Sequence, residues 1–270
     1  HTSVIRFLEQ RFGVEEPNIT PWRRAVCGDL TSVFDFATPN ASAAPLPDTS
    51  GYIAAADATR ALPRPAVPSV AVAATQEHGQ RPARALPYDL QVQCAADAAR
   101  KGVTLAFANS GAVGAAFNVY LAGGAAGPWF FTIEAGKSLQ HELFAGVDAF
   151  DITVFGPNGL WRNFRAAAGG ASLDATAIAD STQQALAVTV HNSGVAPLTA
   201  SLRARAYGDH HQDVALAPGQ SVQTLWPTAN SANWYDVEVT CAGDAHFSRR
   251  FAGHIETGAP SMSDPLIGVP

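Results

Sequence analysis

The sequence predicts a mainly β protein with two tandem antiparallel β-sandwiches. After Pro87, short apolar runs are separated by Gly, Asn, Asp and Pro at intervals of about ten residues, which is typical of sandwich strands and turns. The run also repeats, because the segment that ends at Gly111 aligns with the one that ends at Gly194, a shift of 83 residues. Each copy is long enough for seven strands. We therefore expect sandwiches over 87–169 and 170–256 and a tail over 257–270.

Residues 1–36 precede the sandwiches and are expected to contain a short helix. His1, Thr2 and Ser3 are suited to begin it, and Gly13 stands where a helix typically ends. The residues between them form an apolar stripe at helical spacing: Val4, Ile5, Leu8 and Phe12. A piece this small cannot bury a core of its own, since domains below roughly 40 residues usually need staples. We therefore expect residues 1–36 to be the remnant of a larger domain and the stripe to need a partner.

Residues 37–86 have the composition of a connector, rich in Ala, Pro and small polar residues. One part, residues 51–62, holds enough alanine for a short helix before Pro63, and the rest is expected to run extended. In a longer protein this connector would lie on the larger domain. Without that domain we expect disorder or arbitrary packing.

Motifs that recur in both repeats have structural explanations that need no ligand. Asn109-Ser-Gly111 and Asn192-Ser-Gly194 predict turns in which glycine adopts a positive φ and asparagine closes the turn with its side chain. The other recurring features are a glycine turn before a strand (Gly136, Gly219) and an aspartate in an alternating, half-buried strand (Asp151, Asp236). These motifs define architecture and name no reaction.

Charge and cysteine usage narrow the function classes. The net charge is -6 at pH 7, so we expect no basic surface for nucleic acid or anionic lipid. No stretch approaches the roughly 20 apolar residues of a membrane span. Cys27, Cys94 and Cys241 are too few and too widely spaced for a disulfide framework or a CxxC metal site. Isolated buried thiols are the favoured interpretation, and a single disulfide is the alternative.

Two blocks of the opening segment carry a family resemblance: His1-Thr-Ser-Val-Ile-Arg-Phe-Leu-Glu9 and Pro21-Trp-Arg-Arg-Ala-Val-Cys-Gly-Asp-Leu-Thr-Ser-Val-Phe-Asp-Phe36. They resemble the C-terminal end of the catalytic domain of bacterial phosphocholine-preferring phospholipases C, which belong to a phosphoesterase family. The match continues through Arg81-Pro-Ala-Arg-Ala-Leu-Pro-Tyr88 and into two copies of a C-terminal domain that these enzymes carry. The resemblance thus covers nearly the whole chain.

The resemblance implies a secreted or periplasmic enzyme that hydrolyses phosphatidylcholine to phosphocholine and diacylglycerol. It places a threonine nucleophile and a divalent metal in a doubly wound α/β domain that is almost entirely absent here. Only the His-Thr-Ser motif carries over, and His1 is the candidate for a phosphate or metal contact, with a plain helix-start residue as the alternative. We expect no cofactor and no complete active site in these 270 residues, hence no activity from this chain alone. The implied partners are the phospholipid, through the missing domain, and the catalytic domain itself.

Trp129, Phe130 and Phe131 follow a Gly-Pro pair and are candidates for contact with lipid, because aromatic rings are favoured at a membrane interface. The competing interpretation is ordinary packing. Alternation along a strand would place one or two of the three rings in the sandwich core and the third outward.

Two further groups have both a functional and a structural interpretation. Asp209, His210, His211 and Asp213 could hold a metal, but we expect a solvated turn between two strands. Three tryptophans invite a carbohydrate-binding role and are as often caps of a core: Trp161, Trp226 and Trp234. No Gly-x-Ser-x-Gly elbow, phosphate loop or pair of catalytic carboxylates is evident. The alternative function is a stand-alone β-sandwich module that binds a sugar, lipid or protein at a cell surface.

Overall fold

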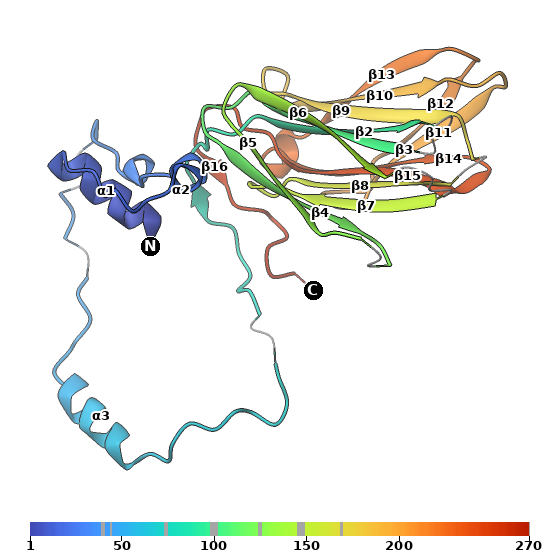
Figure 1. Ribbon diagram of the computed structural model, residues 1–270. Helices are drawn as coiled ribbons and strands as arrows, with labels where there is room; N and C mark the ends of the chain where they lie inside the picture. The colour runs from blue at the N-terminus through green and yellow to red at the C-terminus, as the bar shows by residue number, and fades with distance from the viewer. Residues whose placement is uncertain are drawn as a thin grey trace.

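The computed structural model describes residues 1–38, 41–43, 45–72, 75–97, 102–123, 126–144, 149–167 and 170–269. A helical block at the N-terminus leads into a long open loop, which returns to an elongated β-sandwich (Figure 1). The prediction of a mainly β chain with short helices in front is confirmed. None of the helices in the described ranges is long and apolar enough to cross a membrane.

The N-terminal block, residues 1–36, is built from short helices: α1 (Thr2–Phe12), α2 (Pro21–Val26) and the 3-10 turn η1 (Thr31–Val33). α1 ends as predicted at Gly13, whose φ of 67° lies in the left-handed region. His1 is the residue before the first turn, but its side chain makes no capping hydrogen bond. α2 starts at Pro21, and the hydroxyl of Thr20 caps it by accepting from the backbone N–H of Arg23 at 3.3 Å.

Each repeat contributes seven strands within the described residues, as the sequence predicts. Those of the first are β2 (Leu90–Asp97), β3 (Gly102–Asn109), β4 (Ala115–Leu121), β5 (Trp129–Ile133), β6 (Lys137–Phe144), β7 (Ala149–Phe155) and β8 (Trp161–Ala167). Those of the second are β9 (Leu173–Asp180), β10 (Ala185–Asn192), β11 (Leu198–Ala204), β12 (His211–Leu216), β13 (Ser221–Pro227), β14 (Trp234–Cys241) and β15 (Asp244–His254), with the 3-10 turn η3 (Ala229–Ser231) before β14. Gly169, the first glycine of the predicted junction, lies outside the described residues.

The two repeats share one topology and one large sheet. A three-stranded sheet, β2-β3-β6 in the first repeat and β9-β10-β13 in the second, packs on four strands in the equivalent orders β5-β4-β7-β8 and β12-β11-β14-β15. These two sets of four strands are joined into a single eight-stranded sheet, because β8 pairs antiparallel with β15. The internal repeat predicted two sandwiches but did not reveal that their edges are fused.

One continuous hydrophobic core fills the space between the sheets of both repeats. At the junction, the buried rings of Phe164 on β8 and Phe251 on β15 meet edge to face with their centroids 6.3 Å apart. Along the strands of this core, buried and partly exposed residues alternate, as in β7, where Phe150, Ile152 and Val154 point inward. The expectation of half-buried, alternating strands around Asp151 and Asp236 is confirmed.

The two Asn-Ser-Gly turns confirm one part of the prediction and correct another. Asn109 and Asn192 are buried, and their side-chain oxygens accept hydrogen bonds from the N–H groups of Gly111 and Gly194 at 3.0 and 2.9 Å. Neither glycine has a positive φ, however. Glycine is required because the chain passes too close: a Cβ on Gly111 would lie 2.8 Å from the backbone N of Asp89, and one on Gly194 would lie 2.9 Å from Cβ of Ser172.

The connector is not uniformly free of structure. The predicted helix is present as α3 (Tyr52–Ala58), which continues into the 3-10 turn η2 (Thr59–Ala61), and both are exposed on the open loop of Figure 1. Near its end the connector forms β1 (Pro82–Ala83), which pairs antiparallel with β16 (Ser261–Met262) in the predicted tail. The expectation of disorder or arbitrary packing is therefore wrong for this stretch, because backbone pairing with the tail holds it on the sandwich.

Candidate functional site

His1 lies at the exposed start of α1. Its carbonyl oxygen accepts hydrogen bonds from the backbone N–H groups of Val4 and Ile5, at 3.1 and 3.2 Å. Thr2 and Ser3 already belong to the helix. Among the residues that the structure describes, no three His, Cys, Asp or Glu side chains come together in a way that could hold a metal ion. A phosphate or metal contact by His1 therefore stays a prediction.

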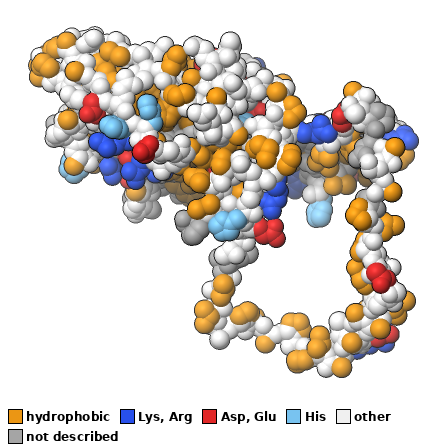
Figure 2. All heavy atoms as spheres, turned by 180° about the vertical axis from the view of Figure 1, so that it is seen from behind, with side chains coloured by type: hydrophobic (Ala, Val, Ile, Leu, Met, Phe, Trp, Pro, Cys, Tyr) orange, Lys and Arg blue, Asp and Glu red, His pale blue; other side chains and the backbone are white. Residues whose placement is uncertain are grey.

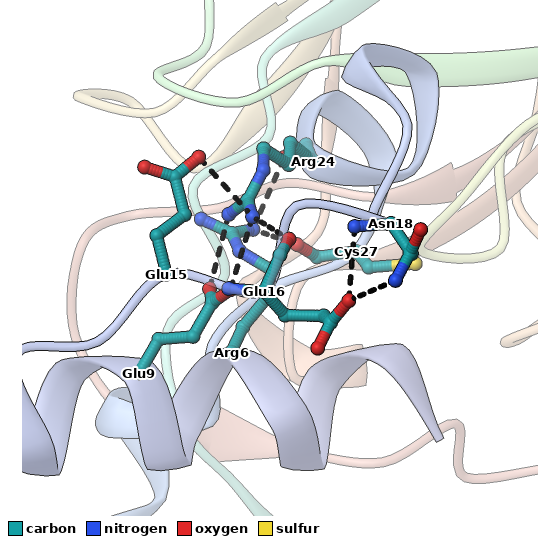
Figure 3. Close-up of polar contacts among 7 residues, drawn as sticks. All are labelled: Arg6, Glu9, Glu15, Glu16, Asn18, Arg24 and Cys27. Carbon is teal, nitrogen blue, oxygen red and sulfur yellow. Dashed lines mark hydrogen bonds and ion pairs between the residues drawn. The ribbon is translucent and has the colours of Figure 1, made fainter.

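The N-terminal block is held together by a network of polar contacts around Arg24 (Figure 3). The guanidinium of Arg24 donates to both carboxylate oxygens of Glu9 on α1, at 3.0 Å each, and to the backbone carbonyl of Glu16 at 2.8 Å. The carboxylate of Glu15 lies 3.3 Å from the same guanidinium. This hydrogen bonding by Arg24 holds the pKa of Glu9 below its usual value. The bidentate pair fixes α2 against α1.

Two further side chains in Figure 3, those of Arg6 and Glu16, make contacts that order the turns linking the helices. Arg6 on α1 donates to the backbone carbonyls of Arg24, at 3.0 Å, and of Cys27. The carboxylate of Glu16 accepts from the backbone and side-chain N–H groups of Asn18, at 2.9 and 2.6 Å. The polar framework of the block is therefore made by its own side chains.

The apolar stripe of the block is not covered by the residues that the structure describes. Only Ile19 is buried within the block, at 7% exposure. The predicted stripe on α1 is open to solvent, with exposed fractions of 52% for Val4, 46% for Leu8 and 66% for Phe12. Large apolar side chains that are neighbours on one helix and all exposed indicate a surface that another body covers.

The block rests on the first repeat beside β4 and β5. The indole N–H of Trp22 on α2 donates to the hydroxyl of Thr132 on β5 at 2.8 Å. Just before β4, Gly114 lies so close to α2 that a Cβ there would be 2.8 Å from the carbonyl oxygen of Ala25. Trp22 nevertheless keeps 54% of its surface exposed.

Of the three candidates for lipid contact, only Phe130 points outward, with 67% of its surface exposed. Trp129 and Phe131 pack against the core, where Phe131 lies 5.0 Å from Phe107 between ring centroids. This is the alternation expected for a strand. Two exposed aromatic side chains on neighbouring strands, Tyr120 and Phe155, were not singled out from the sequence, because showing that they are neighbours requires the strand register.

The group Asp209, His210, His211 and Asp213 does not converge on one point. The ring of His210 packs edge to face on the buried Trp226, with centroids 4.5 Å apart, whereas Asp213 accepts a hydrogen bond from the hydroxyl of Ser201 at 2.5 Å. His211 begins β12, so the group lies where the β11–β12 loop meets its strand, close to the turn that the sequence predicts.

The tryptophans and cysteines mostly serve structure. Trp234 is half-buried and its indole donates to the carbonyl of Met262 in β16 at 3.0 Å, so it holds the tail. All three cysteines are free thiols, and the favoured interpretation of buried thiols is confirmed for Cys94 and Cys241, whereas Cys27 is only partly buried. Burial raises the pKa of Cys94 to about 12, so this thiol remains protonated and unreactive at neutral pH.

Comparison with known proteins identifies the family. The family model described as "Bacterial phospholipase C, C-terminal domain" matches the chain twice, over residues 82–170 and 165–254. The chain is 44% identical over 280 residues to a non-hemolytic phospholipase C of Burkholderia pseudomallei. This alignment covers 99% of this chain and 40% of the relative. It is 43% identical to a non-hemolytic and 35% identical to a hemolytic phospholipase C of Pseudomonas aeruginosa, each over 100% of this chain.

The alignments cover nearly all of this chain but only part of each relative. The chain spans about two fifths of the length of these enzymes. The two family matches coincide with the two structural repeats, and the identity to the relatives extends through the N-terminal block. The chain belongs to the bacterial phospholipase C family and carries two tandem copies of that family's C-terminal domain.

Proposed function

We propose that this chain is the C-terminal part of a phospholipase C that hydrolyses phosphatidylcholine to phosphocholine and diacylglycerol, and that its two sandwiches are non-catalytic accessory modules. The observation that carries the proposal is the pair of family matches together with relatives named phospholipase C over the whole chain. The reaction is assigned to the part of the enzyme outside this chain. Secretion or export to the periplasm is part of the same proposal.

The reactive side chains of the described residues support the assignment of catalysis to the other part of the enzyme. They provide no group of metal-capable side chains, so they do not fit the divalent metal that the family resemblance implies. His1 stands at the start of α1 and belongs to no such group among the described residues. We therefore assign the threonine nucleophile and the metal to the catalytic domain, and His1 at most to the edge of that site.

The exposed apolar surfaces support a partner domain that packs against this chain. The stripe of α1 is uncovered, and hydrophobic side chains also line the open loop around α3 (Figure 2). On that loop Leu46, Val67 and Val72 are 90%, 93% and 86% exposed. Surface of this kind is costly in water and is normally covered. In the intact enzyme the block and the loop would wrap the catalytic domain.

Turnover of p-nitrophenylphosphorylcholine tests the assignment. The intact enzyme is expected to release p-nitrophenol, and the 270-residue chain at equal concentration is expected to release none above the buffer rate. Far-UV circular dichroism of the chain, showing a folded β protein, is the control for loss of structure. Hydrolysis by the chain alone would refute the non-catalytic role, and no hydrolysis by the intact protein would refute the choice of substrate.

A second experiment tests the packing of the stripe. Leu8→Ser in the intact enzyme should lower the midpoint of thermal unfolding, because a polar group would enter a contact made by apolar side chains. The matched control is Val195→Ser, a residue 98% exposed in the turn before β11. Equal effects of the two substitutions would show that the stripe stays in solvent.

A further inference from the structure

Four aromatic side chains and one amide form a row across the outer face of the eight-stranded sheet in the first repeat. The strands β5, β4, β7 and β8 are neighbours in that order. In their register Phe130 lies opposite Asn118, Asn118 opposite Phe155, and Phe155 opposite Trp161. Residues directly opposite on adjacent strands project from the same face of the sheet. Tyr120 belongs to this face too, since it is two residues after Asn118.

The row faces solvent rather than the core. The intervening residues on β4 and β7, Val119 and Val154, are fully buried on the inner face. The exposed fractions in the row are 67% for Phe130, 45% for Phe155 and 42% for Tyr120. Phe155 and Tyr120 pack edge to face with their centroids 5.7 Å apart, and Asn118 lies between Phe130 and Phe155 in the strand register. Single exposed apolar residues are ordinary, but several exposed aromatic side chains on one sheet face indicate an interaction site.

Charges of both signs lie beside the row. Trp161, at its end, lies beneath the guanidinium of Arg250, which is 5.0 Å from the ring centroid. That guanidinium donates to both carboxylate oxygens of Asp236 at 2.7 and 2.6 Å. Asp151, on the same face, accepts from the side-chain amide of Asn163 at 2.6 Å. With the chain's net charge of -6, this surface offers no attraction for an anionic membrane but suits a zwitterionic one.

The row also continues toward the N-terminal block. Thr132 is two residues after Phe130 on β5 and shares its face, and it accepts the hydrogen bond from the exposed indole of Trp22. The aromatic surface therefore runs from the second repeat's Arg250 to the block that would join the catalytic domain. A lipid surface held by this row would lie next to that domain.

We propose that the outer face formed by Tyr120, Phe130, Phe155 and Trp161 docks on the surface of a zwitterionic phospholipid bilayer. Aromatic rings prefer the boundary between headgroups and acyl chains, where one part of the ring is apolar and the other is wet. The choice of phospholipid rests on the proposed function, and the geometry of the row does not. In the intact enzyme the face would hold the protein on aggregated substrate while contributing nothing to the chemical step.

Sedimentation of the 270-residue chain with phosphatidylcholine vesicles tests this proposal. The double variant F130S/F155S should bind these vesicles at least about tenfold more weakly than wild type, because two rings no longer leave water. The matched control is I178S/L225S, which changes two side chains of similar exposure, 43% and 44%, on the outer face of the sheet β9-β10-β13. The control should bind as wild type does, and both variants should keep the wild-type circular dichroism spectrum.

The following binding and turnover results would overturn the proposal. Wild type that stays in the supernatant at millimolar lipid, or equal loss in both double variants, would show that the row is not a lipid surface. Binding to immobilised oligosaccharides that F130S/F155S alone loses, without vesicle binding, would assign the row to sugar. Loss of p-nitrophenylphosphorylcholine turnover in intact F130S/F155S would show that the row packs on the catalytic domain, since that substrate is soluble. Vesicle binding without turnover by the intact wild type would instead refute the proposed substrate and leave the row intact.

Discussion

Asn163 on β8 and Arg250 on β15 lie directly opposite each other, and they are equivalent residues of the two repeats. Their equivalence follows from Phe164 and Phe251, which align at a shift of 87 residues. A residue that pairs with its own counterpart lies on a local two-fold axis. The fusion of the two sandwiches is therefore a pseudo-symmetric contact, of the kind in which a self-complementary patch meets its copy.

The arginines next to this axis are related by the same two-fold symmetry. Arg162 and Arg249 are 2% and 3% exposed, and each lies opposite the other repeat's phenylalanine. Arg162 donates to the carbonyls of Trp161 and Ala252 at 2.9 and 2.5 Å. Arg249 makes the equivalent bonds to Ser248 and Arg165 at 3.1 and 2.8 Å. Each of the two buried guanidiniums thus donates hydrogen bonds to backbone carbonyls of both repeats and joins them.

Replacing either arginine by alanine should destabilise the chain strongly. R162A and R249A each remove two hydrogen bonds to backbone carbonyls and leave a hollow between aromatic rings, so we expect losses of about 3 to 5 kcal/mol in the free energy of unfolding. Arg165→Ala, at an exposed position of the same strand, should change it by less than about 0.5 kcal/mol. Urea unfolding followed by tryptophan fluorescence measures all three. Equal stability of R162A, R249A and R165A would refute the role of the buried pair.

The fold could be predicted from the sequence where local rules decide it. Repeat length, alternation and turn glycines such as Gly136 and Gly219, both with positive φ, fix the strands and their turns. The buried arginines could not be predicted, because an arginine in an alternating strand is normally solvated and only the partner strand from the other repeat encloses it. The lipid candidates show the same limit. Alternation predicted one outward ring, but the neighbours of Phe130 come from strands whose order the sequence does not state.

Gly111 provides a test of the corrected explanation of the Asn-Ser-Gly turn. If a positive φ were the only reason for glycine at this position, G111A should be harmless, because the φ of Gly111 is not positive. We expect instead a loss of about 1 to 3 kcal/mol, because the added Cβ would overlap the carbonyl oxygen of Pro87 and displace the segment that leads into β2. Gly28→Ala is the control, since a Cβ on Gly28 would project into open space. A loss in G111A no larger than in G28A would contradict this explanation.

Glu256 should make the stability of the chain depend on pH in the acid range. Burial alone would raise its pKa, but hydrogen bonds from His254 at 3.0 Å, the backbone N–H of Leu86 at 3.0 Å and Asn158 at 2.7 Å outweigh burial and lower the pKa below its usual value. A lowered folded-state pKa contributes stability that is complete above the unfolded value and is lost as pH falls through the folded value.

The prediction for Glu256 is therefore a difference in slope. Between pH 7 and about 5 the contribution of Glu256 to the unfolding free energy should be nearly constant, and below the unfolded pKa of about 4.3 the unfolding free energy of wild type should fall more steeply than that of E256Q. Because Leu86 belongs to the connector and Asn158 to the first repeat, E256Q should also be less stable at pH 7. Glu134→Gln, at an exposed turn, is the control. Parallel pH curves for wild type and E256Q would exclude this carboxylate as the cause.

Arg24 should decide whether the N-terminal block keeps its structure in this chain. R24K retains the charge, but an ammonium group cannot reach both oxygens of Glu9 and the carbonyl of Glu16 at once. We expect severalfold faster amide hydrogen exchange in residues 13–20, where the backbone N–H of Glu16 donates to Glu9 at 2.6 Å. The neighbouring exposed residue offers a matched control, Arg23→Lys, which should leave exchange unchanged. Unchanged exchange in R24K would mean that apolar contacts, and not the bidentate pair, hold α1 to α2.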